Sequence, residues 1–287
     1  MSLNKNITFP ENLSNFLYWV KDTTESYWSK LPHDKLIHGA KWLPLTDQQI
    51  DELELKYSIK FGIEHRLFLR ILHTIDKHYD DEWEEVKYIE SEEERRGKPL
   101  WSPLYRPSYF YNWITEKEWI ESRLAWINDF YTISISGPGK SWLRSWGPRP
   151  ESDEERVQIF REWYQKAPRL LPITAHTFLM DDGGHGLRPV MSVYGFDTII
   201  MGWSLRHFLM LEFDVELGLT EIYYDDKEDY PEGYTDLVKG IPELDVLMTI
   251  RLNDTDIPYW KEALTYYHHP DQNCWQGFWV PWSKSEL

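Results

Sequence analysis

The hydrophobic pattern between Glu162 and Phe213 constrains the fold of this chain more than any other feature of its sequence. Two apolar runs, Leu170 to Leu179 and Pro189 to Met201, are bounded by Asp, Gly and Pro and are typical of β-strands. Gly195 interrupts the second run. Because glycine turns at the lowest conformational cost, we predict a tight hairpin there, with Asp197 just past the bend.

After Gly202 the hydrophobic period changes from two residues to about 3.6, which predicts a helix directly behind the strands. Ser204 is well placed to cap the start of this helix. Its predicted buried face consists of Leu205, Phe208, Leu209 and the run from Leu211 to Phe213.

Apolar spacing and capping residues predict further helices along the rest of the chain. In order, these are Leu13 to Leu31, a helix opened by Thr46, Ile63 to His78, a helix opened by a Thr115–Glu118 capping box, a helix opened by a Ser152–Glu155 capping box, and Ile257 to Tyr267 with Pro258 in its first turn.

The central segment also carries a recognisable series of motifs. It couples Leu171, Pro172, Ile173 and His176 to Pro189, Val190, Ser192, Val193, Asp197 and Ile199, and then to a helix that ends in Glu212 and Phe213. This order resembles the Smi/Knr branch of the SUKH superfamily. The segment from Leu45 to Leu72 resembles the family's N-terminal helix pair, but it has Phe61-Gly62 where the family has Leu-Pro, and it lacks the family's glycine after the second helix.

The resemblance covers roughly residues 40–215 and implies an α+β fold with one mixed or mostly antiparallel sheet and helices packed against it. It implies a SUKH-like domain over residues 40–215, preceded by a helical extension over 1–39. An acidic, aromatic extension over 216–287 is expected to pack on the same body. Within the matched motif, Pro172, His176, Pro189, Ser192, Asp197, Glu212 and Phe213 are expected to fix the fold rather than to perform chemistry.

The resemblance further implies a non-enzymatic binding protein. Bacterial members of the superfamily resemble immunity proteins that neutralise polymorphic toxins by direct binding. Fungal members act as scaffolds that regulate cell-wall synthesis. We therefore expect an immunity protein, with a regulatory scaffold as the first alternative and a carbohydrate-active protein as the second.

Composition limits the classes of partner. The net charge of −17 disfavours binding to nucleic acid, which requires clustered Lys and Arg. It favours binding to a basic protein such as a toxin domain. A role of the charge in solubility alone would also explain it. No apolar run is long enough to span a bilayer, so we expect no membrane insertion. The absence of a secretory signal and the single cysteine, Cys274, lead us to expect a cytoplasmic protein.

Two groups of residues contain metal-ligand side chains, but neither has a spacing typical of a metal site, so we predict no metal and no cofactor. The groups are His176, Asp181, Asp182 and His185, and His268, His269, Asp271 and Cys274. The Gly-Lys-Ser at Gly139 to Ser141 lacks the first glycine of a phosphate-binding loop. No other catalytic motif is present, so we expect no enzymatic activity.

The predicted partner-binding surface is an acidic segment with interleaved aromatic residues, because aromatic anchors with a charged rim suit a strong interface. The acidic run from Asp80 to Glu94 is a second candidate. The predicted contact residues are Tyr223, Tyr224, Asp225, Asp226, Glu228, Asp229 and Tyr230.

Overall fold

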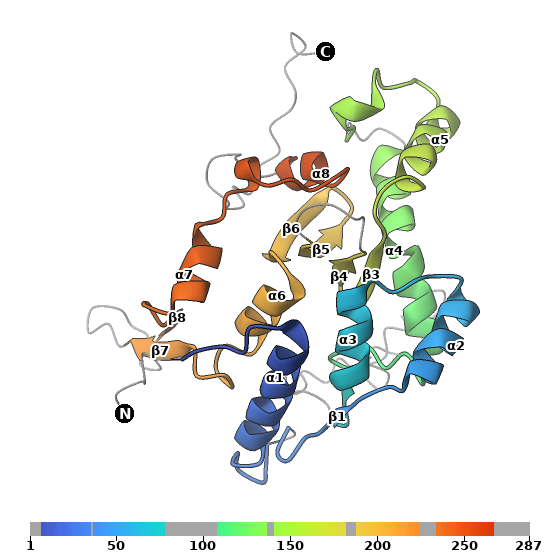
Figure 1. The fold of residues 1–287 in the computed structure, drawn as a ribbon. Helices are drawn as coiled ribbons and strands as arrows, with labels where there is room; N and C mark the ends of the chain where they lie inside the picture. The colour runs from blue at the N-terminus through green and yellow to red at the C-terminus, as the bar shows by residue number, and fades with distance from the viewer. Residues whose placement is uncertain are drawn as a thin grey trace, which may run out of the picture.

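The computed structural model describes residues 7–35, 37–77, 108–136, 141–181, 188–223 and 234–266. Within these residues, helices pack around a central antiparallel sheet, as Figure 1 shows, which confirms the predicted α+β class. The strands of this sheet lie in sequence order and are β3 (Leu170–Thr174), β4 (Thr177–Met180), β5 (Val190–Tyr194) and β6 (Asp197–Gly202).

Two hairpins form most of the sheet. The second is the predicted one: Tyr194 pairs with Asp197, and Gly195 has a φ of 61°. The first was predicted as a single strand, and that prediction was wrong. The chain reverses after Thr174, which pairs with Thr177, and Ala175 adopts a φ of 43°. Alanine is disfavoured at positive φ, so the sequence lacks the usual signal for this turn.

Both faces of the sheet are covered, which explains why its strands are apolar throughout rather than alternating. Successive residues of β3 point to opposite faces: Leu171 and Ile173 join one buried cluster, and Leu170 joins another. The sheet is therefore the middle of three layers.

The helices that contribute most residues to the first cluster are α1 (Leu13–Trp28), α2 (Asp47–Tyr57), α3 (Ile63–Ile71) and α6 (Leu205–Glu212). Two N-caps are those that the sequence predicts. Thr46 and Gln49 form a capping box on α2, and the Ser204 hydroxyl accepts a hydrogen bond from the His207 amide at 3.1 Å on α6.

The predicted continuation of α3 to His78 was wrong. The helix ends at Ile71, and His73 has a φ of 61°. Its ring Nδ1 bonds the Leu43 carbonyl at 2.8 Å, and its Nε2 accepts a hydrogen bond from the Trp113 amide at 3.0 Å. These bonds turn the chain into β2 (Thr74–Ile75), which pairs with β1 (Trp42–Leu43).

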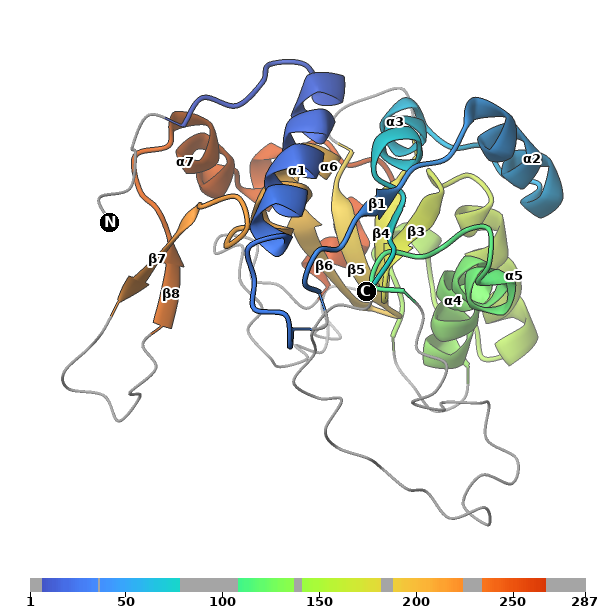
Figure 2. The same cartoon turned by 90° about the horizontal axis from the view of Figure 1, so that it is seen from below.

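The opposite face of the sheet carries α4 (Lys117–Ile135), α5 (Asp153–Tyr164), the short 3₁₀ helix η3 (Arg144–Trp146) and α8 (Lys261–Thr265). Figure 2 shows α4 and α5 packed side by side. The predicted capping box of Thr115 is absent, because the α4 N-cap is Glu116, whose carboxylate accepts a hydrogen bond from the Asn112 amide at 2.8 Å. Ser152 caps α5 as predicted.

The C-terminal part of the described chain is less regular. The predicted helix from Ile257 is shorter than expected and begins at Lys261. The other elements are a two-stranded sheet of β7 (Thr220–Tyr223) and β8 (Tyr234–Leu237), the helix α7 (Pro242–Thr249) and the 3₁₀ helix η4 (Leu252–Asp254). Among the helices described, none is long and apolar enough to cross a membrane.

Candidate functional site

Helix α4 carries a row of aromatic rings directly beside the stripe of its core residues. Trp119, Arg123, Trp126 and Phe130 follow one another at spacings of four, three and four residues, which places them on one helical face. The Trp126 and Phe130 ring centroids are 4.1 Å apart. Tyr194, at the end of β5, completes the row: its ring lies 4.3 Å from Phe130, and the residue is 54% exposed. We call these five residues the α4 row.

The α4 row is held rigidly. The Trp126 indole donates a hydrogen bond to the Val193 carbonyl at 2.7 Å, which fixes the helix to β5. The Arg123 guanidinium lies 4.0 Å from the Trp126 ring centroid and 5.7 Å from that of Trp119, so a cation–π contact links two of the rings. A rigid aromatic surface loses little entropy when it binds, which favours recognition.

Arg123 forms no direct ion pair within the described part of the chain. It is 6% exposed, and its Nε donates to the Tyr111 hydroxyl at 2.7 Å. Its Nη1 is shielded from water and meets no hydrogen-bond acceptor among the described residues. Burial raises the pKa of Tyr111 to about 12, although the Arg123 charge opposes this, so the phenol stays neutral and donates in turn to the Ala175 carbonyl.

His176 lies in the β3–β4 turn, close to this cluster. Its pKa is lowered by burial and by the Arg123 charge, while Asp197 opposes the shift. The structure thus brings Arg123, for which the sequence predicts no role, close to two residues of the motif, His176 and Asp197. Asp181, in contrast, lines a separate hollow.

The other motif residues occupy structural positions. Pro172 and Ser192 are buried in β3 and β5. The Pro189 carbonyl accepts a hydrogen bond from the Met180 amide at 3.1 Å. Phe213 is fully buried and contacts the rings of Trp28, Trp42 and Phe110.

Glu212 ends α6 in an acidic neighbourhood. Its pKa is raised to about 7, first by burial and then by the nearby carboxylates of Glu216 and Asp214. The Trp28 indole donates to Glu216 at 3.3 Å. Within the described ranges, no group of three or more His, Cys, Asp or Glu side chains is arranged to hold a metal ion.

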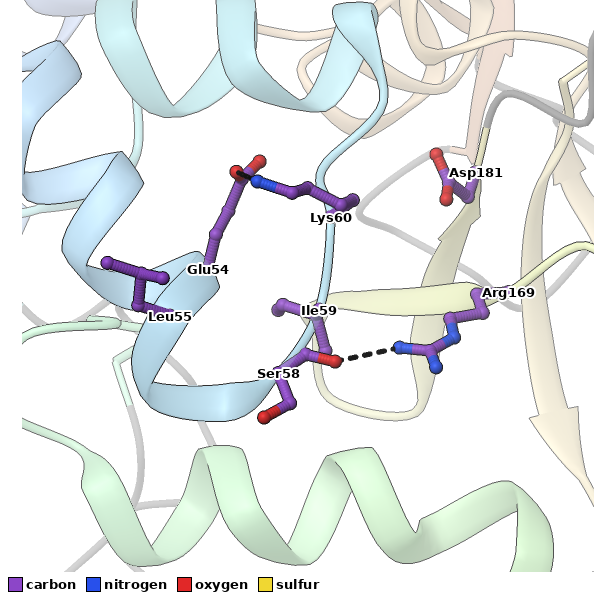
Figure 3. A pocket seen from close by; sticks show the side chains of 7 residues that line it. All are labelled: Glu54, Leu55, Ser58, Ile59, Lys60, Arg169 and Asp181. Carbon is purple, nitrogen blue, oxygen red and sulfur yellow. Dashed lines mark hydrogen bonds and ion pairs between the residues drawn. The ribbon is translucent and has the colours of Figure 1, made fainter.

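A hollow of about 450 Å³ lies between the α2–α3 loop and the start of β3 (Figure 3). Its polar groups already have structural partners. Arg169 donates to the Ser58 carbonyl at 3.2 Å, and Lys60 pairs with Glu54 at 2.6 Å. Burial alone would raise the pKa of Glu54, but hydrogen bonds from Lys60, the Phe61 amide and Arg66 lower it, so this carboxylate ties the loop together.

The predicted partner-binding segment is mostly outside the described residues. Tyr223 ends β7, whereas Tyr224, Asp225, Asp226, Glu228, Asp229 and Tyr230 lie outside, as does the acidic run 80–94. The metal-ligand candidates Asp182, His185, His268, His269, Asp271 and Cys274 also lie outside the described ranges.

The sequence does contain a signal for the α4 row. The apolar spacing of this helix predicts a core stripe of Ile120, Leu124, Ile127 and Tyr131, and three of these are fully buried, with Leu124 partly exposed. A second stripe of aromatic residues at the same helical spacing lies beside that core stripe. A helix with two large apolar stripes has more apolar surface than one core contact requires, and this excess was the available signal.

Comparisons of the chain with models of protein families, with curated proteins and with solved structures find no match.

Proposed function

We propose that this protein is a non-enzymatic binding protein that recognises a protein partner through the α4 row. The observation that carries the proposal is the composition of that surface. Trp and Tyr are among the residue types that contribute most often to binding energy at protein interfaces, and both occur in the α4 row, where the buried Arg123 supports the Trp119 and Trp126 rings. Tyr194 and Ile133 add exposed apolar surface beside the half-buried Trp126 and Phe130.

The kind of partner is proposed from the resemblance and the charge. Neutralisation of a toxin by direct binding is the function that the SUKH resemblance supports, with a regulatory scaffold as its alternative. The net charge of −17 would accelerate association with a basic partner through long-range attraction. Binding of an acidic protein to a basic toxin therefore accounts for both features.

The charge argument has its own test. Replacing the four carboxylates Asp225, Asp226, Glu228 and Asp229 by amides should slow association with the partner most at low salt, because screening removes long-range attraction at high salt. Stopped-flow association rates at two ionic strengths measure this. An unchanged association rate would remove this acidic segment from the proposal.

The first step in testing the α4 row is to isolate the chain from its own cells and to identify any polypeptide that accompanies it stoichiometrically. That polypeptide is then produced separately, and its affinity for the full chain is measured by calorimetry. Growth of cells that express the polypeptide alone, or together with this chain, reports whether it is a toxin that the chain neutralises. Several substoichiometric partners would favour the scaffold instead.

The decisive comparison is between two tyrosines of similar exposure. Tyr194 in the α4 row is 54% exposed, and Tyr18 on α1 is 51% exposed. Tyr194→Ala should weaken binding by about 30-fold, the effect of losing roughly 2 kcal/mol at an interface anchor. Tyr18→Ala should leave the affinity within about twofold. Equal effects of the two changes would refute the assignment of the α4 row.

A further inference from the structure

A second hollow, of about 440 Å³, lies between β6, α6 and the segment that runs from α7 to α8. In Figure 1 this segment passes beside β6 and α6 on its way to α8. We call this hollow the β6 groove. Its walls are mainly apolar and include Ile200, Met201, Leu211, Met248, Leu252 and Leu264. Its volume and apolar walls are typical of sites that bind small molecules.

The first polar group of the β6 groove is His207. The Trp203 amide donates a hydrogen bond to its Nδ1 at 3.2 Å, so in the neutral ring the proton must be on Nε2. The residue is 3% exposed, and Nε2 meets no acceptor among the described residues. Burial lowers the pKa of His207 to about 4, although Glu243 opposes the shift, so the ring remains a neutral donor near pH 7. A buried donor without an acceptor is unfavourable, and an acceptor atom in a ligand would remove that cost.

The second polar group is Arg251, which lines the groove and is exposed, so it stands at the mouth. Its guanidinium forms no hydrogen bond or ion pair with the described residues. A guanidinium binds a carboxylate well, because its N–H groups match the two carboxylate oxygens.

We propose that the β6 groove binds a small apolar carboxylate, such as a free medium-chain fatty acid. The carboxylate accepts hydrogen bonds from Arg251, and also from Nε2 of His207 once the side chains that cover this nitrogen move aside, and the hydrocarbon chain lies along the apolar wall. Met201 and Met248 suit such a ligand, because their flexible side chains adapt to the shape of an apolar chain. This inference does not depend on the proposed partner-binding function, because the groove and the α4 row involve different residues.

The test is calorimetry of the full chain with three ligands of equal chain length, each below the concentration at which it self-associates. Decanoate should bind saturably at one site. Decanol, which has an acceptor but no charge, should bind about tenfold more weakly, and decylamine, which has the opposite charge, should show no saturable binding. Arg251→Gln should weaken decanoate binding about tenfold and leave decanol unchanged, whereas Lys239→Gln, an exposed lysine outside the groove, should change neither.

A pair of charge substitutions on α7 keeps the test independent of changes that could disturb folding. Met248 lines the groove and is 55% exposed, whereas Val246, on the same helix, is 63% exposed and does not line it. Met248→Glu should abolish decanoate binding through repulsion at the mouth, and Val246→Glu should leave it within about twofold. The proposal is overturned if decanoate shows no saturable binding, if decylamine binds as tightly as decanoate, or if the two glutamate variants behave alike.

Discussion

Among the glycines that the structure describes, Gly202 is the one at which an added methyl group would make the closest contacts. It is the last residue of β6, and α6 passes directly over it. A Cβ atom at Gly202 would lie 2.5 Å from the Phe208 amide nitrogen, 2.7 Å from its Cα and 2.8 Å from its Cβ. Ordinary contacts begin at 3.4 Å, so the helix backbone would have to move by about 0.9 Å, the difference between 3.4 and 2.5 Å.

That movement cannot be local, because α6 is held by its own core contacts. Leu205, Phe208 and Leu209 are all buried in the cluster between α1, α3 and the sheet. Overpacking a core costs about 1–3 kcal/mol and sometimes more. Since the atoms that clash belong to backbone, which cannot rotate away, we expect Gly202→Ala to lower the free energy of unfolding by about 3 kcal/mol.

Urea unfolding, followed by tryptophan fluorescence and circular dichroism, measures this loss. Gly218→Ala is the matched control: its φ is +71°, but a Cβ there would meet nothing within 4 Å. It should cost only about 1–2 kcal/mol, the strain of a side chain in the left-handed region. A loss for Gly202→Ala no larger than that for Gly218→Ala would refute the close approach of β6 and α6.

Three further predictions concern buried charged and titratable groups. Burial lowers the pKa of His73 to about 4 and that of His65 to about 3, so their unfolded forms bind protons first as the pH falls. Their contribution to stability is present above pH 6.5, and each should lose about 2 kcal/mol between pH 7 and 5. His73→Gln should remove its own share, about 2 kcal/mol, from the pH dependence measured by urea titrations. Glu212 has the opposite pH dependence, because its pKa is raised to about 7 in the folded state. Its ionisation therefore lowers the free energy of unfolding as the pH rises from 4.5. Glu212→Gln should remove this loss, which is about 2–3 kcal/mol between pH 5 and 8. A parallel pH dependence of the variant and the parent protein would contradict either assignment. Finally, Arg123→Met removes a buried cation that has no carboxylate partner among the described residues. The free energy of unfolding, measured by thermal unfolding, should therefore change by less than about 1 kcal/mol. The affinity for the partner should nevertheless fall about tenfold. A large loss of stability with unchanged affinity would show that Arg123 serves the fold alone.

The sequence predicted those elements whose local signals agree with their surroundings. The Gly195 hairpin and the caps at Thr46 and Ser204 are examples, because a turn or cap residue sets the backbone conformation of the residues next to it. The β3–β4 turn was missed because Ala175 carries no turn signal and is held by the strand pairing on either side. The end of α3 was missed because the tertiary contacts of His73, with Leu43 and Trp113, override a regular apolar spacing.

The candidate site was harder to predict than the fold, because its members come from separate parts of the chain. Trp126 and Phe130 belong to α4, but Tyr194 joins them only through the packing of α4 on β5. The role of Arg123 depends on the absence of a carboxylate partner among the described residues, which no local pattern reveals. The sequence instead favours the segment from Tyr223 to Tyr230, where dense charge and aromatic residues produce a signal from composition alone.

The residues that hold the fold together differ from the residues that could bind a partner, and burial distinguishes the two sets. Pro172, Ser192 and Phe213 are enclosed within the layers, so they cannot touch another protein unless the sheet comes apart. In the α4 row, in contrast, Tyr194 is 54% exposed, and Trp119, Trp126 and Phe130 are partly exposed beside the buried stripe of α4. Substitution of Tyr194 or Phe130 would therefore alter the binding surface while the core remains packed. A fold arranged in this way can acquire a new partner without acquiring a new core.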